Sequence, residues 1–314
     1  MKKKFDFAKY APIFALVILF ILSSFASPYF FQFKNITNIL RQSSYTGIIG
    51  LGMTFVIISG GIDLSVGSLV ALVGGIVILL LNYFGGDPMA ITWAILMGLC
   101  LGLIMGSFNG LIVTKGKIAP FIATLGTMSI FRSLTLYISS AGEFRSASDA
   151  YPAIGSGYFL NLPIPVWVFF GMAIIFHVIL NNTRYGRYVC AVGANEKVAV
   201  YSAIKIDRVK IMTYALTGFA VAVSSIMLSS RMNSLSSSNA GVFYELDAIA
   251  AVVIGGTSMS GGSGTIMGTV IGAIILGMIN NMLNMVGVSP YLQGTVKGLV
   301  IIFAVLVQYK RKNN

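Results

Sequence analysis

Long uncharged hydrophobic stretches alternate with short polar segments along most of the chain. Between Gln42 and Thr114 the only charged residues are Asp63 and Asp87, which leave uncharged stretches of 21, 23 and 27 residues. A membrane-spanning helix needs roughly 20 mostly apolar residues, whereas the strands of a membrane β-barrel alternate apolar and polar positions over roughly ten residues. These stretches do not alternate, so the pattern predicts a helical integral membrane protein.

The same pattern, followed along the whole chain, predicts about ten membrane-spanning helices. Their approximate ranges are 11–32, 44–61, 65–83, 90–114, 119–140, 164–181, 211–231, 246–260, 265–286 and 291–308. We expect one polytopic all-α transmembrane domain over residues 1–314, with a first half at 1–163 and a second half at 164–314. The polar residues 35–42 are expected to form a short segment at the membrane interface.

The positions of the cationic residues support this count and orient the chain. An even number of spans places both termini on one side, and the side whose short loops are rich in Lys and Arg faces the cytoplasm. Fifteen of the 21 cationic residues fall on the side of the termini: Lys2, Lys3, Lys4, Lys9, Lys115, Lys117, Arg184, Arg187, Lys197, Lys205, Arg208, Lys210, Lys310, Arg311 and Lys312. We therefore expect both termini and the loop 182–210 to be cytoplasmic. The first apolar run is long enough to be an uncleaved helix.

Composition excludes several functional classes. The chain is 56% hydrophobic and 10% charged, with a formal net charge of +12. The cations lie in short tracts between apolar stretches and form no basic face interleaved with aromatic residues, which argues against nucleic-acid binding. His177 has no second histidine to help complete a zinc site, and Cys100 and Cys190 are expected to be reduced and structural. We expect no metal and no cofactor in this chain.

Glycine spacing predicts a close contact between two helices. Gly98, Gly102, Gly106 and Gly110 recur at every fourth position of the span 90–114. Residues four apart share one face of a helix. A face made of glycines lets the backbone of a neighbouring helix come close, as is common in membrane proteins.

Two internal similarities indicate that the chain contains a repeat. Gly106, Asn109, Gly116, Pro120 and Phe121 match Gly277, Asn280, Gly287, Pro290 and Tyr291. The first turn is expected on the cytoplasmic side and the second on the outside, which is the sense of an inverted repeat of about five helices. The second similarity, 60–68 against 255–263, has a different offset and does not fit the same duplication.

The segment 60–68, Gly-Gly-Ile-Asp-Leu-Ser-Val-Gly-Ser, interrupts the apolar pattern with unusual chemistry. Its glycines break a span and leave backbone groups and the Asp63 carboxylate near membrane depth, where irregular backbone must line water or packed protein. The segment therefore predicts a gate or a pathway element made of Gly60, Gly61, Asp63 and Ser65. A structural carboxylate that caps a helix beginning near Leu64 is the alternative, and the two interpretations are compatible.

Other polar side chains lie inside apolar stretches. Asn109, Asn280, Asn281 and Asn284 carry amides that suit hydrogen bonding to a polyhydroxylated solute. For any single one of them, hydrogen bonding between helices is favoured over contact with a solute. For Arg132, extension to the external interface is favoured over contact with a solute.

The cytoplasmic loop 182–210 contains a short helical pattern from Asn195 to Ala203, with Asn195 as the N-cap. A short helix displayed on the cytoplasmic face suits docking to a soluble partner. A helix held on the lipid surface by anionic headgroups fits the basic flanks equally well.

Three ordered motifs resemble those of the ribose-type (simple sugar) permeases of bacterial ABC importers. They are residues 60–68, already described, residues 120–128, Pro-Phe-Ile-Ala-Thr-Leu-Gly-Thr-Met, and residues 244–257, Tyr-Glu-Leu-Asp-Ala-Ile-Ala-Ala-Val-Val-Ile-Gly-Gly-Thr. The resemblance implies a permease in the plasma (inner) membrane of a bacterium, paired with an identical or paralogous second permease. It also implies ATP-binding subunits that hold ATP and Mg²⁺, and a periplasmic or lipid-anchored solute-binding protein that delivers a sugar.

By the same resemblance, one group of residues matches the loop whose coupling helix meets the ATPase: Gly193, Asn195, Ala199, Ser202 and Ile204. The chain departs from the family where Ala203 stands in place of a glycine after the serine, and where Ser133 follows the arginine. Related permeases for nucleosides and branched-chain amino acids share the general architecture.

The chain contains no Gly-x-x-x-x-Gly-Lys-Ser/Thr motif, so ATP must be bound by a partner. A secondary transporter or channel for a small polar solute is the competing hypothesis. Proton-coupled carriers usually bury several ionisable residues, whereas Asp63 is nearly alone here. A membrane enzyme is disfavoured because paired carboxylates and an activated nucleophile are missing from the sequence.

Overall fold

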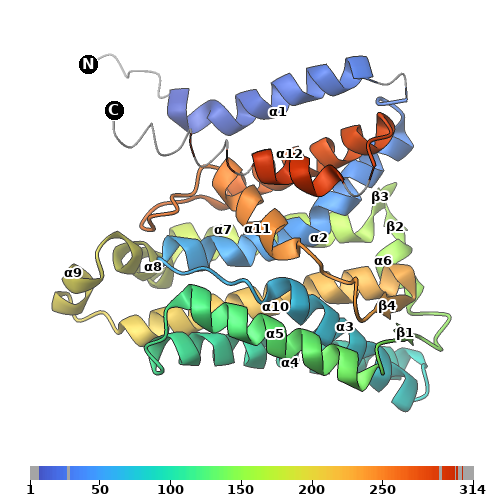
Figure 1. Cartoon of the computed structure of the whole chain (residues 1–314), viewed down its shortest axis with the longest axis horizontal. Coiled ribbons are helices and arrows are strands. Elements are labelled where there is room, and N and C mark those ends of the chain that lie inside the picture. The colour runs from blue at the N-terminus through green and yellow to red at the C-terminus, as the bar shows by residue number, and fades with distance from the viewer. Residues whose placement is uncertain (1–6, 27–28, 290–291, 301, 303–305, 307–314) are drawn as a thin grey trace.

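The computed structural model describes residues 7–26, 29–289, 292–300, 302 and 306, and nearly all of its regular structure is helical. The long helices lie side by side with their axes roughly aligned (Figure 1). They are α1 (Phe7–Ala26), α2 (Phe33–Ile58), α3 (Val66–Tyr83), α4 (Pro88–Thr114), α5 (Pro120–Ile138), α7 (Ile164–Asn182), α10 (Ile206–Met232) and α12 (Ile266–Met285). The shorter helices are α6 (Pro152–Ser156), α8 (Arg184–Ala194), α9 (Glu196–Tyr201) and α11 (Tyr244–Ile254).

The two ends of the bundle differ in structure. At one end lie the connections 115–119 and 183–205, which carry α8 and α9, and we call it the basic end. At the other end, β1 (Glu143–Arg145) pairs antiparallel with β4 (Ser234–Ser236), and β2 (Tyr158–Phe159) pairs with β3 (Leu162–Pro163). We call it the strand end (Figure 1).

Among the residues that the structure describes, six helices are long and apolar enough to cross a membrane: α3, α4, α5, α7, α10 and α12. The prediction of a polytopic all-α membrane protein is confirmed, and each of these helices begins and ends within a few residues of its predicted range, apart from α10, which begins at Ile206 instead of residue 211. The total of about ten spans stays a prediction. The tenth range, 291–308, lies largely outside the described residues, and α11 has 11 residues, a length of about 16 Å, which is short of a hydrocarbon layer about 30 Å thick.

Residues 35–42 do not form a short segment of their own, because they belong to the continuous helix α2, and their place at the membrane interface stays a prediction. The charge of Arg41 does not end the helix, since this side chain has partners in the protein. Its guanidinium donates a hydrogen bond to the Tyr158 hydroxyl and lies 5.1 Å from the centre of the same ring. A paired cation inside a helix bundle is tolerated near the membrane boundary.

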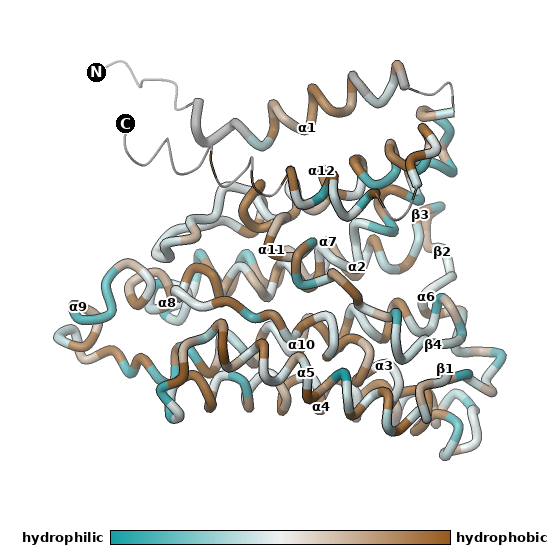
Figure 2. Tube along the Cα trace, in the orientation of Figure 1, coloured by the Kyte–Doolittle hydropathy of each residue, from teal (hydrophilic) through white to brown (hydrophobic). Residues whose placement is uncertain are grey.

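Helices α2 and α10 form the centre of the bundle. On one side of this pair lie α3 and α4, and on the other lie α7, α11 and α12, while α1 packs on the outer side of α12 (Figure 1). Hydrophobic residues run along the full length of the helices, and hydrophilic residues gather at the two ends (Figure 2).

The predicted glycine face brings α4 against α10. A Cβ atom built on Gly102 would overlap the carbonyl oxygen of Gly218 and lie 2.6 Å from the Cβ of Ala222, and one built on Gly110 would lie 2.7 Å from the Cα of Ile211. The close approach of two backbones without intervening side chains increases van der Waals contact where no hydrophobic effect favours helix association.

The outer faces of α4, α5 and α7 are apolar and exposed. Ile104, Ile122 and Ile174 each expose more than half of their surface. Contiguous apolar faces of this kind are unfavourable in water and fit the hydrocarbon layer of a membrane.

We predict that Gly102→Val destabilises the protein, because its methyl groups would push α10 away from α4. The expected loss of stability is about 1–3 kcal/mol or more, seen as a lower midpoint of thermal unfolding in detergent. The matched control is Gly126→Val on α5, where an added Cβ meets nothing within 4 Å. Equal midpoints for the two variants would contradict the close α4–α10 contact.

Candidate functional site

Three buried polar side chains meet in the break between α2 and α3, and we call them the Asp63 network. The Asp63 carboxylate accepts hydrogen bonds from the Ser65 backbone amide at 2.9 Å and from the Ser65 hydroxyl at 2.7 Å. The amide of Asn109, on α4, donates to the Ser65 hydroxyl at 2.7 Å. All three residues are almost completely buried. Four residues proposed for the break therefore lie in one segment, 60–65, and Asn109 joins them from a distant part of the sequence.

The irregular backbone of this break is held by neighbouring helices. The Ile62 carbonyl accepts hydrogen bonds from the Tyr214 hydroxyl on α10, at 3.3 Å, and from the Thr124 hydroxyl on α5, at 3.4 Å. Gly60 has φ of +82°, a conformation that favours glycine, and a Cβ on Gly61 would lie 2.8 Å from the Tyr214 hydroxyl. Both glycines are therefore required by the local geometry.

Asp63 does not cap α3 in the way that the sequence predicts. Helix α3 begins at Val66 with Ser65 as its N-cap, two residues later than expected. The Asp63 carboxylate accordingly bonds to the N-cap residue itself and not to amides of the first helical turn. It fixes the entry into the helix, which is a related but different role.

A second interrupted segment, residues 237–243, precedes α11. The Arg132 guanidinium on α5 donates hydrogen bonds to the carbonyls of Ser237, at 2.7 Å, and Ala240, at 2.8 Å. The expected extension of Arg132 to the external interface stays a prediction, and the structure adds that its guanidinium ends on backbone carbonyls. The side chain turns towards this segment because the Ser237 and Ala240 carbonyls accept hydrogen bonds from it. These hydrogen bonds compensate for the burial of the two carbonyls.

The two interrupted segments meet at their glycines. A Cβ on Gly67, in the first turn of α3, would overlap the Gly241 carbonyl, and a Cβ on Gly241 would overlap the Gly67 carbonyl. Gly241 also has φ of +70°. The start of α3 and the chain leading into α11 therefore meet at backbone atoms, with the Glu245 carboxylate and the Val70 side chain beside this contact.

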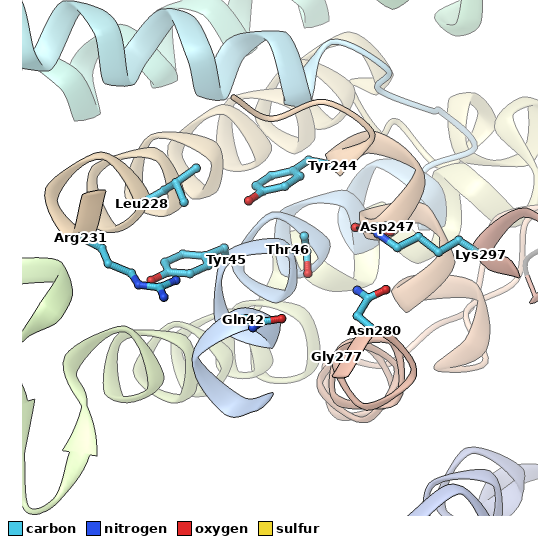
Figure 3. Close-up of a pocket in the computed structure, with 10 residues that line it drawn as sticks. All are labelled: Gln42, Tyr45, Thr46, Leu228, Arg231, Tyr244, Asp247, Gly277, Asn280 and Lys297. Carbon is cyan, nitrogen blue, oxygen red and sulfur yellow. Dashed lines mark hydrogen bonds and ion pairs between the residues drawn. The ribbon is translucent and has the colours of Figure 1, made fainter. Parts of the chain in front are cut away.

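A cavity of about 280 Å³ lies between α2, α10, α11, α12 and the helical stretch 292–300 (Figure 3). We call it the Asp247 cavity. It lies in the half of the bundle nearer the strand end, since it is bordered by Gln42 in the first half of α2 and by Arg231 at the end of α10. The side chains of Tyr45 and Tyr244 face it from α2 and α11.

Charged and polar groups line this cavity. The Lys297 ammonium forms an ion pair with the Asp247 carboxylate at 2.9 Å, and Asp247 exposes only 5% of its surface. Within the described part of the chain, neither the second Asp247 oxygen, Oδ1, nor the side-chain oxygen of Asn280 has a hydrogen-bond partner. The sequence pattern did not single out Asp247 or Arg231 as functional residues. A carboxylate inside the apolar range 246–260 was the available signal.

The structure separates the two neighbouring asparagines of α12. Asn280 lines the Asp247 cavity, whereas the Asn281 amide donates to the side-chain oxygen of Asn35 on α2, at 2.7 Å. Residues one apart on a helix point in directions about 100° apart, so the two amides serve different surroundings. Asn284 is exposed and accepts a hydrogen bond from Gln293.

At the basic end, α8 and α9 form a compact unit. The Asn195 side chain accepts a hydrogen bond from the Val198 amide at 3.1 Å, which confirms its predicted role as an N-cap. Ala199 faces the interior, whereas Val198, Val200 and Tyr201 expose 56%, 57% and 89% of their surfaces.

The buried side of α8 is uncharged at neutral pH. Burial raises the pKa of the Tyr185 hydroxyl and the pKa of the Cys190 thiol. Both groups therefore stay protonated at neutral pH, and the Tyr185 ring stacks on Phe55 of α2 with 6.3 Å between ring centres.

The end of α8 is locked against two other chain segments, in what we call the Gly193 junction. A Cβ on Gly193 would overlap the Ile58 carbonyl at the end of α2 and lie 2.7 Å from the Gly262 amide nitrogen. That amide donates to the same Ile58 carbonyl at 2.8 Å. Ile58 directly precedes the break that carries Asp63. The α8–α9 unit is therefore connected to the Asp63 network by the packing of Gly193 on Ile58 and by the few residues of chain between Ile58 and Asp63.

Among the described residues no group of three or more His, Cys, Asp or Glu side chains is arranged to hold a metal ion. The predicted coupling residues Gly193, Asn195, Ala199, Ser202 and Ile204 lie together at the basic end. Of the other predicted residues, Gly60 and Gly61 lie in the break beside the Asp63 network, Asn280 lines the Asp247 cavity and Asn281 contacts Asn35.

We predict opposite effects for two substitutions in the α8–α9 unit. Gly193→Ala is expected to lower stability by about 1–3 kcal/mol through overpacking. Ala203→Gly is expected to raise it by up to about 1 kcal/mol, because Ala203 has φ of +59°, where glycine is favoured. Thermal unfolding of the purified chain checks both. A Gly193→Ala protein as stable as the wild type would contradict the tight Gly193 junction.

Comparison with known proteins supports one family. Residues 35–305 match the model of the family described as "Branched-chain amino acid transport system / permease component". The chain is 47% identical to the ribose import permease protein RbsC of Bacillus subtilis (strain 168) over 305 residues, 96% of this chain and 93% of the relative. It is 44% identical to RbsC of Haemophilus influenzae over 93% of this chain and 90% of the relative. It is 34% identical to the L-arabinose transport system permease protein AraH of Escherichia coli (strain K12) over 99% of this chain and 95% of the relative.

No solved structure matches this chain. With the membrane-spanning bundle and these relatives over nearly its full length, the chain belongs to this family of multi-pass membrane permease components.

Proposed function

We propose that this chain is the transmembrane permease subunit of an ATP-driven ABC importer that moves a simple sugar into a bacterial cytoplasm. The observation that carries the proposal is the position of α9. It is an exposed helix at the basic end, and the Gly193 junction ties it to the break that holds Asp63. An ATP-binding subunit that moves α9 would thereby move a buried polar segment inside the membrane.

The exposed apolar surface of α9 suits a protein partner. Val198, Val200 and Tyr201 present a contiguous turn of apolar and aromatic side chains to the outside. Aromatic residues in such positions commonly dominate the binding energy of interfaces. A helix lying on lipid headgroups would instead place its apolar residues towards the hydrocarbon layer.

The predicted coupling residues position this surface. Asn195 caps α9, Ala199 packs into the interior, and the Ile204 amide donates to the Ala199 carbonyl at 3.1 Å. Ser202 ends the helix, and Gly193 permits contact with Ile58. We assign ATP and Mg²⁺, and the hydrolysis itself, to the partner subunit.

The pathway is proposed to include Gly60, Gly61, Asp63, Ser65, Asn109, Asn280 and Asn281. Asp63 and Asn109 retain acceptor and donor capacity in a buried setting. In the described structure the Asn109 side-chain oxygen has no partner. Buried polar groups of this kind favour a surrounding that becomes wetted when the protein changes state.

The fold is proposed to comprise about ten spans in two inverted halves, 1–163 and 164–314, with the coupling loop at 182–210. The paired interruptions support this arrangement. Segment 59–65 enters from the basic end and leads into α3, which runs towards the strand end. Segment 237–243 enters from the strand end and leads into α11, which runs towards the basic end. Such opposed half-helices are typical of inverted repeats.

The basic end is proposed to be cytoplasmic, together with both termini, in accordance with the positive-inside rule. The strand end would then face a periplasmic or lipid-anchored solute-binding protein. A second permease, identical or paralogous, completes the membrane unit.

A simple sugar is the favoured solute, and ribose is its first candidate. The relatives named for ribose share 47% and 44% of residues with this chain, compared with 34% for the relative named for L-arabinose. The description of the matching family refers to branched-chain amino acids, which makes these the second candidate class.

We predict that the tagged chain, purified from its native membranes in mild detergent, brings an ATP-binding subunit with it. Tyr201→Arg or Ser202→Arg should reduce its recovery roughly tenfold or more, because the new cation disrupts an apolar contact. Tyr83→Arg, on a residue that is 83% exposed at the strand end, is the matched control and should keep the subunit. Mass spectrometry and quantitative blotting measure the recovery.

Two results would count against this proposal in different ways. Recovery of the wild-type chain without an ATP-binding subunit in several detergents would favour an autonomous carrier. Retention of that subunit by the Tyr201→Arg and Ser202→Arg variants would mean that α9 is not its docking site.

A further inference from the structure

We propose that the Asp247 cavity is a monosaccharide-binding site within each permease subunit, and that Asp247 and Asn280 determine which sugar it accepts. The inference rests on the proposed function, and it locates the solute between α2, α10, α11 and α12 of a single chain (Figure 3).

Two acceptor oxygens in this cavity require donors. Over the described residues, the Oδ1 atoms of Asp247 and Asn280 make no hydrogen bond. An unsatisfied buried acceptor is unfavourable, and for a carboxylate oxygen the penalty is larger than for a neutral group. A ligand that presents hydroxyl donors to both atoms would relieve this penalty.

The cavity also contains donors. Arg231 and Lys297 line it, and each carries more N–H groups than its known partners use. A ligand must therefore both donate and accept hydrogen bonds over a short distance. Hydroxyl groups do both, so a polyol with several adjacent hydroxyls fits the two requirements at once.

Charge distinguishes a sugar from the competing solutes. The lining carries two cations, Arg231 and Lys297, against one carboxylate, but the unpaired Asp247 oxygen requires a hydrogen-bond donor, which an ionised carboxylate ligand does not supply. The same carboxylate already pairs with Lys297, so it is not free to neutralise the ammonium group of an amino acid. Of the residues that line the cavity, Leu228 alone has a purely aliphatic side chain, which is insufficient to surround the side chain of leucine or valine.

Shape and size agree with a small ring. The Tyr45 and Tyr244 rings face the cavity from two helices and offer flat surfaces to the C–H face of a pyranose or furanose. The volume of about 280 Å³ lies just below the roughly 300–1,000 Å³ range of small-molecule sites, as suits a small solute. Tyr244 is the first residue of α11, three residues beyond the Gly67–Gly241 contact, so an occupied cavity is directly linked to the start of α3.

The test uses the complete importer, with the ATP-binding subunit and the solute-binding protein, in proteoliposomes. Uptake of radiolabelled ribose, L-arabinose, D-allose and leucine is measured for the wild type, Asn280→Ala and Asp247→Asn. We expect KM for the transported sugar to rise roughly tenfold in Asn280→Ala, because one ligand hydrogen bond is lost. We expect the ratio of ribose to L-arabinose uptake to change in both variants. The matched control Asn181→Ala, an exposed amide on α7, should leave both quantities unchanged.

A second measurement does not depend on transport. A cysteine introduced as Asn280→Cys is treated with a small water-soluble thiol reagent, and the expected result is labelling that ribose slows and leucine does not. The control is Asn181→Cys, which ribose should not protect.

The outcomes separate the two proposals. If the wild-type importer transports sugar but Asn280→Ala keeps the wild-type KM and selectivity, or Asn280→Cys is not protected by sugar, the cavity is not the sugar site while the importer assignment stands. If no sugar is transported by the wild type and leucine is, the assignment of a sugar importer is wrong.

Discussion

Every peptide group inside a membrane must find a hydrogen-bond partner, and this chain satisfies that requirement with side chains at two places where its helices are interrupted. Tyr214 and Thr124 donate to the Ile62 carbonyl, and Arg132 donates to the Ser237 and Ala240 carbonyls. These donors come from α5 and α10, so the position of both helices is set by the need to reach irregular backbone. The glycine contact between α4 and α10 serves the same end, because it keeps α10 and its Tyr214 close to the first interruption.

The interrupted segments account for where polar chemistry is found in an otherwise apolar protein. A regular helix pairs its own backbone N–H and C=O groups in hydrogen bonds. An interrupted helix leaves some of these groups unpaired, so polar or ionisable side chains must bond to them. Asp63 and Ser65 belong to one interruption, and Arg132 reaches the other. Asp247 lies in the first turn of the half-helix that follows the second. The proposed functional sites and the hydrogen bonding of interrupted backbone therefore involve the same few residues.

Hydrophobic pattern predicted the membrane class and most helix limits, because the requirement for about 20 apolar residues is local and strong. The spacing of Gly98, Gly102, Gly106 and Gly110 predicted a close helix contact for the same reason. The positions of the Arg41 and Arg132 guanidinium groups depend on partners far along the sequence. Arg41 bonds to Tyr158, and Arg132 bonds to two backbone carbonyls. Local sequence patterns did not predict either set of partners. The Asp247 cavity was missed because four helices and the stretch 292–300 form its walls, and no local pattern encodes such an assembly.

The backbone contact of Gly67 with Gly241 has a mechanical consequence. Side chains at a helix contact can change rotamer and so absorb a displacement of one helix without passing it to the other. Two glycines in direct contact have no side-chain rotamers and cannot absorb a displacement in this way. A shift of the chain at one of these glycines must therefore move the other or open the contact, so this contact favours joint movement of α3 and the chain that leads into α11.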